Sequence, residues 1–225
     1  MSATTRIIGH RGYLARFPGN TLAGFAAALG HVDGFELDVR RSSDGKLVLA
    51  HDPELGNLVV SATPWETLAE VDVGGGHKPA LLDEALASID VPAQIEIKND
   101  AAGPGYEPDH RLGLEAAERA RPGDVITSFN WATVARVREV FPDVATGIIL
   151  TSHHDLENAY QHCLEMGHST LVAHHELIRT SVVDLEAEVT PWTVNDLEEA
   201  KRLASLGVSG IITDNPLSLS EIRSQ

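Results

Sequence analysis

Short apolar runs alternate with amphipathic stretches along most of the chain. Most of the runs are rich in Ile and Val, a composition that favours buried strands. The predicted strands lie at residues 7–8, 35–39, 46–50, 93–98, 125–129, 145–150, 170–173, 189–194 and 210–213.

The stretches between these runs predict helices. In the first, at residues 21–29, Asn20 is a candidate N-cap and Gly30 stands where a helix usually ends. Its predicted apolar face comprises Leu22, Phe25, Ala26 and Leu29. The other predicted helices cover residues 82–89, 110–120, 131–141, 155–166, 177–185 and 196–206, and a short final helix follows Pro216.

The order of these elements predicts a closed barrel. When residues 46–50 are set aside as a hairpin return, eight strands alternate with helices, which implies a parallel sheet. We therefore expect an α/β fold, a single-domain (β/α)8 TIM barrel over residues 1–225. A doubly wound open sheet is the rival, but no GxGxxG or Walker-type loop follows a strand. Residues 52–81 fit the repeat least well and are interpreted as a short irregular insertion after the second strand.

Composition and charge narrow the class of protein. Lys and Arg total 17 and Asp and Glu total 33, so the net charge of −16 offers no basic surface for nucleic acid or anionic membranes. The single Cys163 excludes an internal disulfide framework, and no apolar run is long enough for a transmembrane anchor. Because a motif argued below to belong to the active site begins at Arg6, we expect no signal peptide and a cytoplasmic location.

Two predicted strands carry acidic residues on the face opposite to their apolar residues. In residues 35–39, Glu36 and Asp38 alternate with apolar neighbours, and in residues 95–98, Glu96 alternates with isoleucines. The apolar side chains suit the helix-facing side, so the three carboxylates are predicted to point into the barrel. Buried carboxylates need a counter-charge, and Lys98 alone leaves an excess of negative charge. Oxygen ligands of this kind favour Mg²⁺ or Ca²⁺.

A purely structural network is the alternative for these acids. Ion pairs with Arg11, Arg40, Arg41 or Lys98 would explain an isolated Glu-x-Asp, but a second strand with an inward acid favours the divalent cation.

Histidines and basic residues supply the remaining candidate chemistry. His10 and His51 follow strands at the barrel mouth and form a candidate acid/base pair. Arg11 offers a planar fork for a phosphate, and Lys98 a second cation. Most other histidines are predicted to lie on the surface or in loops: His31, His110, His153, His154, His162 and His168.

The order of short motifs resembles the glycerophosphodiester phosphodiesterase family over nearly the whole chain. The matching motifs are His10-Arg11-Gly12, Pro18-Gly19-Asn20-Thr21, Phe35-Glu36-Leu37-Asp38-Val39, Asp44-Gly45, His51-Asp52-Pro53, residues 79–86, Ile95-Glu96-Ile97-Lys98, Ser128-Phe129-Asn130, Trp192-Thr193-Val194-Asn195 and residues 210–216.

This resemblance implies a TIM barrel that hydrolyses a phosphodiester with a divalent cation. It places the essential histidines at His10 and His51 and the metal-binding acids at Glu36, Asp38 and Glu96. It also implies that the phosphate is contacted by Arg11 and Lys98, and that the substrate cleft is lined by Phe129 and Trp192. The expected reaction converts a glycerophosphodiester to an alcohol and glycerol 3-phosphate, so the expected partner is a small-molecule phosphodiester.

Two departures from the family pattern concern the substrate pocket. The family usually has glutamate where this chain has Gly19, and it usually has Arg-Thr-Thr in the stretch after His51-Asp52-Pro53. Both differences bear on which alcohol the diester carries.

Two other functions remain open from the sequence. One is a non-catalytic barrel that binds phosphorylated metabolites, and the other is a phosphodiesterase or lyase acting on lysophospholipids. The presence of both histidines and all three acids argues against the first. The single cysteine argues against the second, because the related venom enzymes are disulfide-bonded. Asp214 is interpreted as the start of a turn before Asn215-Pro216.

Overall fold

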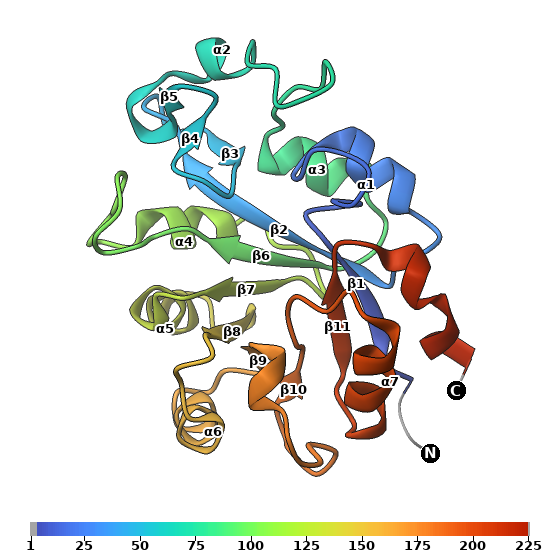
Figure 1. The fold of residues 1–225 in the computed structure, drawn as a ribbon. Coiled ribbons are helices and arrows are strands. Elements are labelled where there is room, and N and C mark those ends of the chain that lie inside the picture. Colours follow the sequence, from blue (N-terminus) through green and yellow to red (C-terminus); the bar gives the residue numbers. More distant parts are fainter. Residues whose placement is uncertain (1–3, 225) are drawn as a thin grey trace.

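Eight parallel strands surround the centre of the molecule. The computed structural model describes residues 4–224, and within them the predicted barrel is confirmed (Figure 1). The barrel strands are β1 (Arg6–His10), β2 (Gly34–Arg41), β6 (Ala93–Ile97), β7 (Val125–Ser128), β8 (Ala145–Leu150), β9 (Thr170–Ala173), β10 (Glu188–Val189) and β11 (Gly210–Thr213).

The barrel closes at a short seam between its seventh and eighth strands. The regular ladder runs from β10 through β9, β8, β7, β6, β2 and β1 to β11. At the seam, the amides of Ser209 and Ile212 donate to the carbonyls of Val189 and Pro191, each at 2.9 Å. The strand predicted at residues 189–194 is regular only as far as Val189, because Pro191 has no N–H to donate.

The predicted alternation of side chains along the strands is present. On β2, Phe35, Leu37 and Val39 belong to the large core between sheet and helices, whereas Glu36 and Asp38 lie on the opposite face. The inner face of the other strands carries a separate apolar cluster of Ile8, Ile149, Val172 and Ile212, against which Phe129 and Trp192 pack. The barrel interior therefore has a charged side at β2 and β6 and an apolar side across from it.

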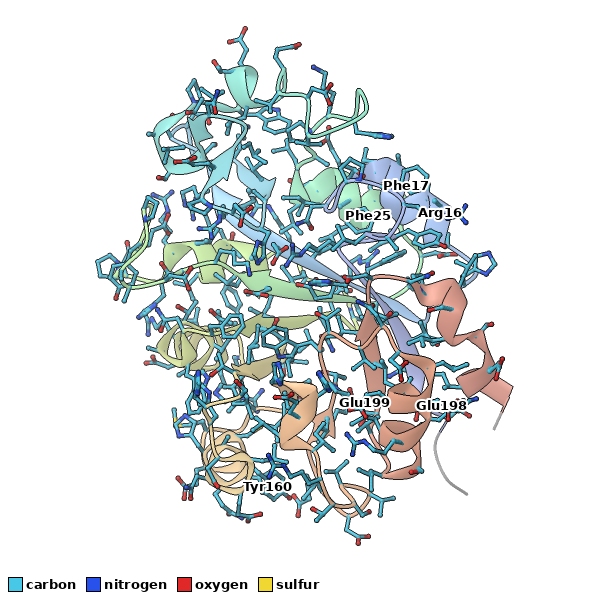
Figure 2. All side chains as sticks on the ribbon, in the orientation of Figure 1. Arg16, Phe17, Phe25, Tyr160, Glu198 and Glu199 are labelled. Carbon is cyan, nitrogen blue, oxygen red and sulfur yellow. The ribbon has the colours of Figure 1, made fainter. Side chains whose placement is uncertain are left out.

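Most predicted helices are present on the outside of the barrel. Phe25 on α1, labelled in Figure 2, is fully buried. Its ring packs edge-on against Phe35 of β2, with 5.1 Å between ring centroids. The segment after Pro216 is a 3₁₀ helix, η3 (Pro216–Ser224). The α-helices around the barrel are α1 (Leu22–Ala28), α3 (Leu82–Ser88), α4 (Arg111–Ala117), α5 (Trp131–Val140), α6 (Leu156–Glu165) and α7 (Leu197–Ser205).

The helix predicted at residues 177–185 is wrong. The chain forms only η2 (His175–Leu177) and then a series of turns. Ile178 and Val182 are buried, but the Ile178 carbonyl and the Val182 amide bond to α7 and its end. Arg202 donates to the Ile178 carbonyl at 2.9 Å, and the Val182 amide donates to the Leu206 carbonyl at 2.8 Å. Contacts with a neighbouring element thus replace the internal ladder of a helix.

The predicted start and apolar face of the first helix are also corrected. Thr21, not Asn20, caps α1, because its hydroxyl accepts from the Gly24 amide at 3.2 Å. Asn20 is in the left-handed region with φ of 61°, and its side chain faces the barrel interior. The buried residues of α1 are Gly24, Phe25 and Ala28.

The segment between β2 and α3 contains ordered elements. As predicted, β3 (Leu47–Leu49) returns antiparallel along β2. The residues expected to be irregular include the hairpin β4 (Glu54–Leu55) and β5 (Leu58–Val59), η1 (Val60–Ala62) and α2 (Trp65–Leu68). They pack on a small core that includes Val60 and Leu68, at the top of the view in Figure 1. Among residues 4–224, no helix is both long and apolar enough to span a bilayer.

Candidate active site

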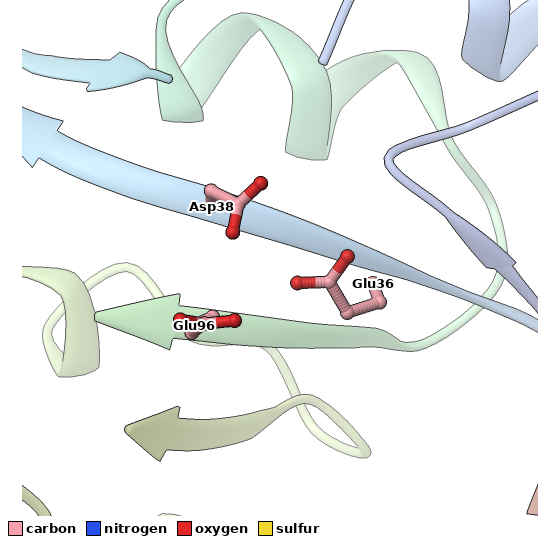
Figure 3. Close-up of side chains that lie close together, drawn as sticks. All are labelled: Glu36, Asp38 and Glu96. Atoms are coloured by element: carbon pink, nitrogen blue, oxygen red, sulfur yellow. The ribbon is translucent and has the colours of Figure 1, made fainter. Parts of the chain in front are cut away.

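Three carboxylates meet inside the barrel. Glu36 and Asp38 extend from β2 and Glu96 from the adjacent β6, where Asp38 and Glu96 are register partners (Figure 3). One oxygen from each residue lies within 4.8 Å of the others, and all three side chains are buried. Alternation along two paired strands is sufficient to bring them together.

Two cations and an amide hold this triad from one side. The Lys98 ammonium contacts Asp38 at 2.9 Å and also bonds to Glu96. The Arg11 Nε lies 3.0 Å from the other Asp38 oxygen, and the Asn20 amide donates to that oxygen at 2.8 Å. Each oxygen of Asp38 therefore has an ion-pair contact with a basic side chain, whereas Glu36 forms no ion pair with Arg11 or Lys98 within residues 4–224.

Glu36 provides the test of whether the triad suits a cation. Both of its carboxylate oxygens are buried, and neither accepts a hydrogen bond from the described part of the chain. Burial, followed by repulsion from Asp38 and Glu96, raises the pKa of Glu36 well above its ordinary value. Its contact with a basic group within residues 4–224 is the His10 ring, at 3.8 Å, and a hard divalent cation prefers oxygen ligands of this kind. The residues present therefore fit a Mg²⁺- or Ca²⁺-like ion.

The other two carboxylates differ in pKa because of their neighbours. Burial and the nearby Asp38 charge raise the pKa of Glu96 to about 7. Burial also disfavours the charged form of Asp38, but Lys98 and Arg11 outweigh it and lower the pKa of that carboxyl. At neutral pH the triad therefore has one firmly ionised member and two whose ionisation a bound cation would promote.

His10 is oriented by a residue from the far end of the chain. Its Nδ1 lies 2.6 Å from Asp214 Oδ1, and its Nε2 lies 3.8 Å from Glu36 Oε2. Asp214 is held in turn by the Asn195 amide, which donates to its second oxygen at 2.7 Å. The pairing directs the Nε2 of His10 towards the triad.

His51 is held mainly through its backbone. Its carbonyl accepts two hydrogen bonds from Arg40, from Nε at 3.0 Å and from a terminal nitrogen at 2.8 Å. Its ring Nδ1 lies 2.8 Å from Asp52. Burial and then the Lys98 charge lower the pKa of the imidazole, so it is neutral at pH 7.

One cavity of about 220 Å³ joins these groups. Of the nine predicted site residues, all but Asp38 line it, and Asp38 lies behind Arg11 and Lys98. Phe129 and Trp192 form one wall, in edge contact at 5.6 Å between ring centroids, and the Lys98 ammonium lies 5.8 Å from the Phe129 ring centre. The residues that line the cavity are His10, Arg11, Glu36, His51, Glu96, Lys98, Thr127, Phe129, Ile149, Val172, Trp192, Thr193 and Ile212.

Four residues that support the site were not assigned a role in it from the sequence. Asp214 contacts His10, Asn195 holds Asp214, Asn20 holds Asp38 and Arg40 holds the backbone at His51. Asp214, Asn195 and Asn20 each lie far from their partners in the sequence. Only their positions within the matching motifs could have indicated that they belong to the site. His174 and His175 stack on each other, and neither is among the residues lining the cavity.

The fold and this cavity define a TIM-barrel enzyme whose acidic, basic and imidazole groups gather at the carboxyl ends of the strands. Residues 10–218 match the model of the glycerophosphoryl diester phosphodiesterase family. The chain therefore belongs to this family and is a phosphoric diester hydrolase that acts on glycerophosphodiesters.

Individual relatives agree over nearly their whole lengths. A glycerophosphodiester phosphodiesterase of Caldanaerobacter subterraneus is 29% identical, with 96% of each chain covered. The crystal structure of a glycerophosphodiester phosphodiesterase from Thermotoga maritima is 26% identical, with a TM-score of 0.77 over 97% of this chain and 98% of that one. The fold also matches an Oleispira antarctica phosphodiesterase in complex with the product sn-glycerol-3-phosphate, at 22% identity and a TM-score of 0.85, over 98% and 97% of the two chains.

Proposed function

We propose that this protein hydrolyses a glycerophosphodiester to an alcohol and sn-glycerol 3-phosphate, with Mg²⁺ or Ca²⁺ held by Glu36, Asp38 and Glu96. The observation that carries this proposal is the buried carboxylate of Glu36, which has no hydrogen-bond donor among the described residues and faces two further acids. The product bound by the Oleispira antarctica phosphodiesterase supports the choice of product.

Each predicted site residue has a role that its surroundings support. A cation in the triad would polarise a phosphate oxygen and lower the pKa of a hydroxyl or water beside it. Arg11 and Lys98 neutralise the charge that develops on the phosphoryl oxygens. Phe129 and Trp192 offer apolar surface to the carbon atoms of the substrate.

The two histidines carry the proton transfers. One of His10 and His51 takes a proton from the nucleophile, and the other gives a proton to the leaving alkoxide. Asp214 supports this role for His10, because a carboxylate on Nδ1 fixes the tautomer and the orientation of the ring.

The extent of the domain and its location are part of the same proposal. We propose one domain, because a single large core includes residues from Ile7 to Ile222.

We also propose that the protein acts in the cytoplasm, where the buried, unpaired thiol of Cys163 would stay reduced.

Metal removal and histidine replacement test the proposal together. We expect exhaustive chelation to abolish release of glycerol 3-phosphate from glycerophosphocholine, and added Mg²⁺, Ca²⁺ or Mn²⁺ to restore it. His10→Ala and His51→Ala should each lower kcat by roughly 10²- to 10⁴-fold. His153→Ala, on an exposed histidine, is the matched control.

Two results would contradict these assignments. Full activity after chelation would exclude the cation site, and near-normal rates in both histidine variants would exclude the acid/base pair. No turnover of glycerophosphodiesters or bis(p-nitrophenyl) phosphate with any of the metals would instead favour the non-catalytic binding protein.

A further inference from the structure

A second cavity adjoins the first on the other side of Arg11 and His51. It has a volume of about 230 Å³ and lies between the loop that joins β1 to α1 and the segment that follows β3. Arg11 and His51 line both cavities. The two spaces are therefore compartments of one site, with a phosphate-binding arginine and an imidazole at their boundary.

Gly19 helps to keep this second compartment open. A Cβ atom at this position would lie 3.0 Å from the Leu14 side chain and 3.2 Å from the side-chain carbons of Arg11. The stem of Arg11 thus packs directly on the glycine backbone. A larger residue here would require the side chains of Leu14 and Arg11 to shift by a few tenths of an ångström.

The two compartments suit different halves of a diester. The first lies within the barrel against Phe129 and Trp192, whose apolar rings suit the carbon atoms of glycerol. The second is bordered by Asp52 and Glu54, whose side chains are exposed, so a larger alcohol can extend from it towards solvent. A phosphate held at Arg11 would extend one of its two ester groups into each compartment.

The lining of the second compartment combines apolar walls with negative charge. Asp52 is engaged by the His51 ring, but the Glu54 carboxylate makes no hydrogen bond or ion pair with the side chains and backbone described between residues 4 and 224. The acids Asp52 and Glu54 line this compartment together with one basic side chain, Arg11. Arg11 already forms an ion pair with Asp38. The apolar walls include Leu14, Pro18, Leu49, Leu55, Val73 and Pro79.

We propose that this second compartment binds the alcohol half of the diester and selects alcohols that carry an ammonium group, with Glu54 as the residue that determines the specificity. A choline or ethanolamine moiety matches the lining, because its methyl or methylene groups meet apolar walls and its charge meets a free carboxylate. The inference rests on the proposed function, since it assigns the leaving group of the same reaction.

Binding to a slowed variant tests the inference apart from turnover. In the His10→Ala protein with Mg²⁺, calorimetry would compare glycerophosphocholine and glycerophosphoethanolamine with glycerophosphoglycerol and glycerophosphoinositol. We expect the two ammonium diesters to bind roughly three- to tenfold more tightly, the range for a partly exposed charge pair with apolar contact. Adding Glu54→Gln should reduce that preference to about twofold or less, with no change for glycerol 3-phosphate, which lacks the alcohol half.

Glu66→Gln is the matched control, because Glu66 is an exposed acid on α2 outside the cavity. Equal affinity for all four diesters, or an equal loss for all four in the Glu54→Gln variant, would overturn the inference. Hydrolysis by the unmodified chain separates the two proposals. Binding with the ammonium preference but without turnover would refute only the proposed function, and turnover without preference would refute only this inference.

Discussion

Glu36 and Asp38 show how strongly position alone determines the state of a carboxyl group. They are two residues apart on one strand and equally hidden from solvent, yet their pKa values move in opposite directions. The difference arises because Asp38 is in direct contact with Lys98, Arg11 and the Asn20 amide. The charges of Lys98 and Arg11 also act on Glu36, but burial and repulsion from Asp38 and Glu96 outweigh them. A ligand that carries positive charge is thus favoured on the Glu36 side of the triad.

Asp214→Asn tests whether His10 depends on its distant partner. We expect kcat to fall roughly 10- to 10³-fold with little change in KM, because an amide at Nδ1 no longer fixes the tautomer that the reaction needs. Steady-state assays with glycerophosphocholine measure both constants. Asp184→Asn, an exposed acid, should have no effect, and a purely structural role for Asp214 would show instead as reduced stability with normal kcat.

At the scale of elements, the loop between β1 and α1 assigns different tasks to two adjacent residues. Thr21 caps the helix through the Gly24 amide. Asn20 reaches into the barrel, where its amide donates to the Asp38 carboxylate and its oxygen accepts from the Asp38 backbone amide. The same short loop therefore begins a helix and fixes one member of the triad.

These tasks predict separable effects of two neighbouring substitutions. Thr21→Ala should lower the free energy of unfolding by about 1 kcal/mol, as expected for loss of an N-cap, with normal activity. Asn20→Ala should weaken the apparent Mg²⁺ affinity by roughly 10- to 100-fold, because a residue that orients a ligand is lost. Urea titrations and metal-dependent rates measure the two effects, and equal loss of metal affinity in both variants would contradict the division.

The elements predicted from the sequence are those with strong local signals. Strand alternation placed the three acids on one face, and the barrel prediction is confirmed because Ile- and Val-rich runs mark the strands directly. Residues 177–185 could not be predicted correctly, because their amides and carbonyls bond to α7, an arrangement that local spacing does not reveal. The contact of Asp214 with His10 joins residues 204 positions apart, so the turn signal at Asn215-Pro216 hid it. The assigned roles of the site residues themselves stay predictions.

At the scale of the whole molecule, one buried histidine links stability to pH. His168 lies in a loop, as predicted, but its side chain is buried at 4% exposure, and its Nδ1 lies 2.8 Å from the Thr146 hydroxyl. Its Nε2 has no hydrogen-bond partner among the described residues. Burial, followed by the charges of His162 and Arg138, lowers its pKa to about 4.

The consequence is a loss of stability in acid. The unfolded chain binds a proton at this histidine near pH 6.5, and the folded chain binds it only near pH 4, so stability is full above pH 6.5 and falls as the pH drops towards 4. The loss attributable to this group is on the order of 3 kcal/mol at the acid end. Denaturant titrations at a series of pH values should show a shallower decline for His168→Gln. Parallel curves for the two proteins would contradict this origin of the pH dependence.

The charged and apolar sides of the barrel interior together determine the orientation of a small molecule that enters it. With three carboxylates and the Lys98 ammonium on the side of β2 and β6 and an apolar cluster across from them, the interior is charged on one side and apolar on the other. A small molecule is therefore turned to a fixed orientation, with its anionic end towards one wall and its carbon skeleton towards the other.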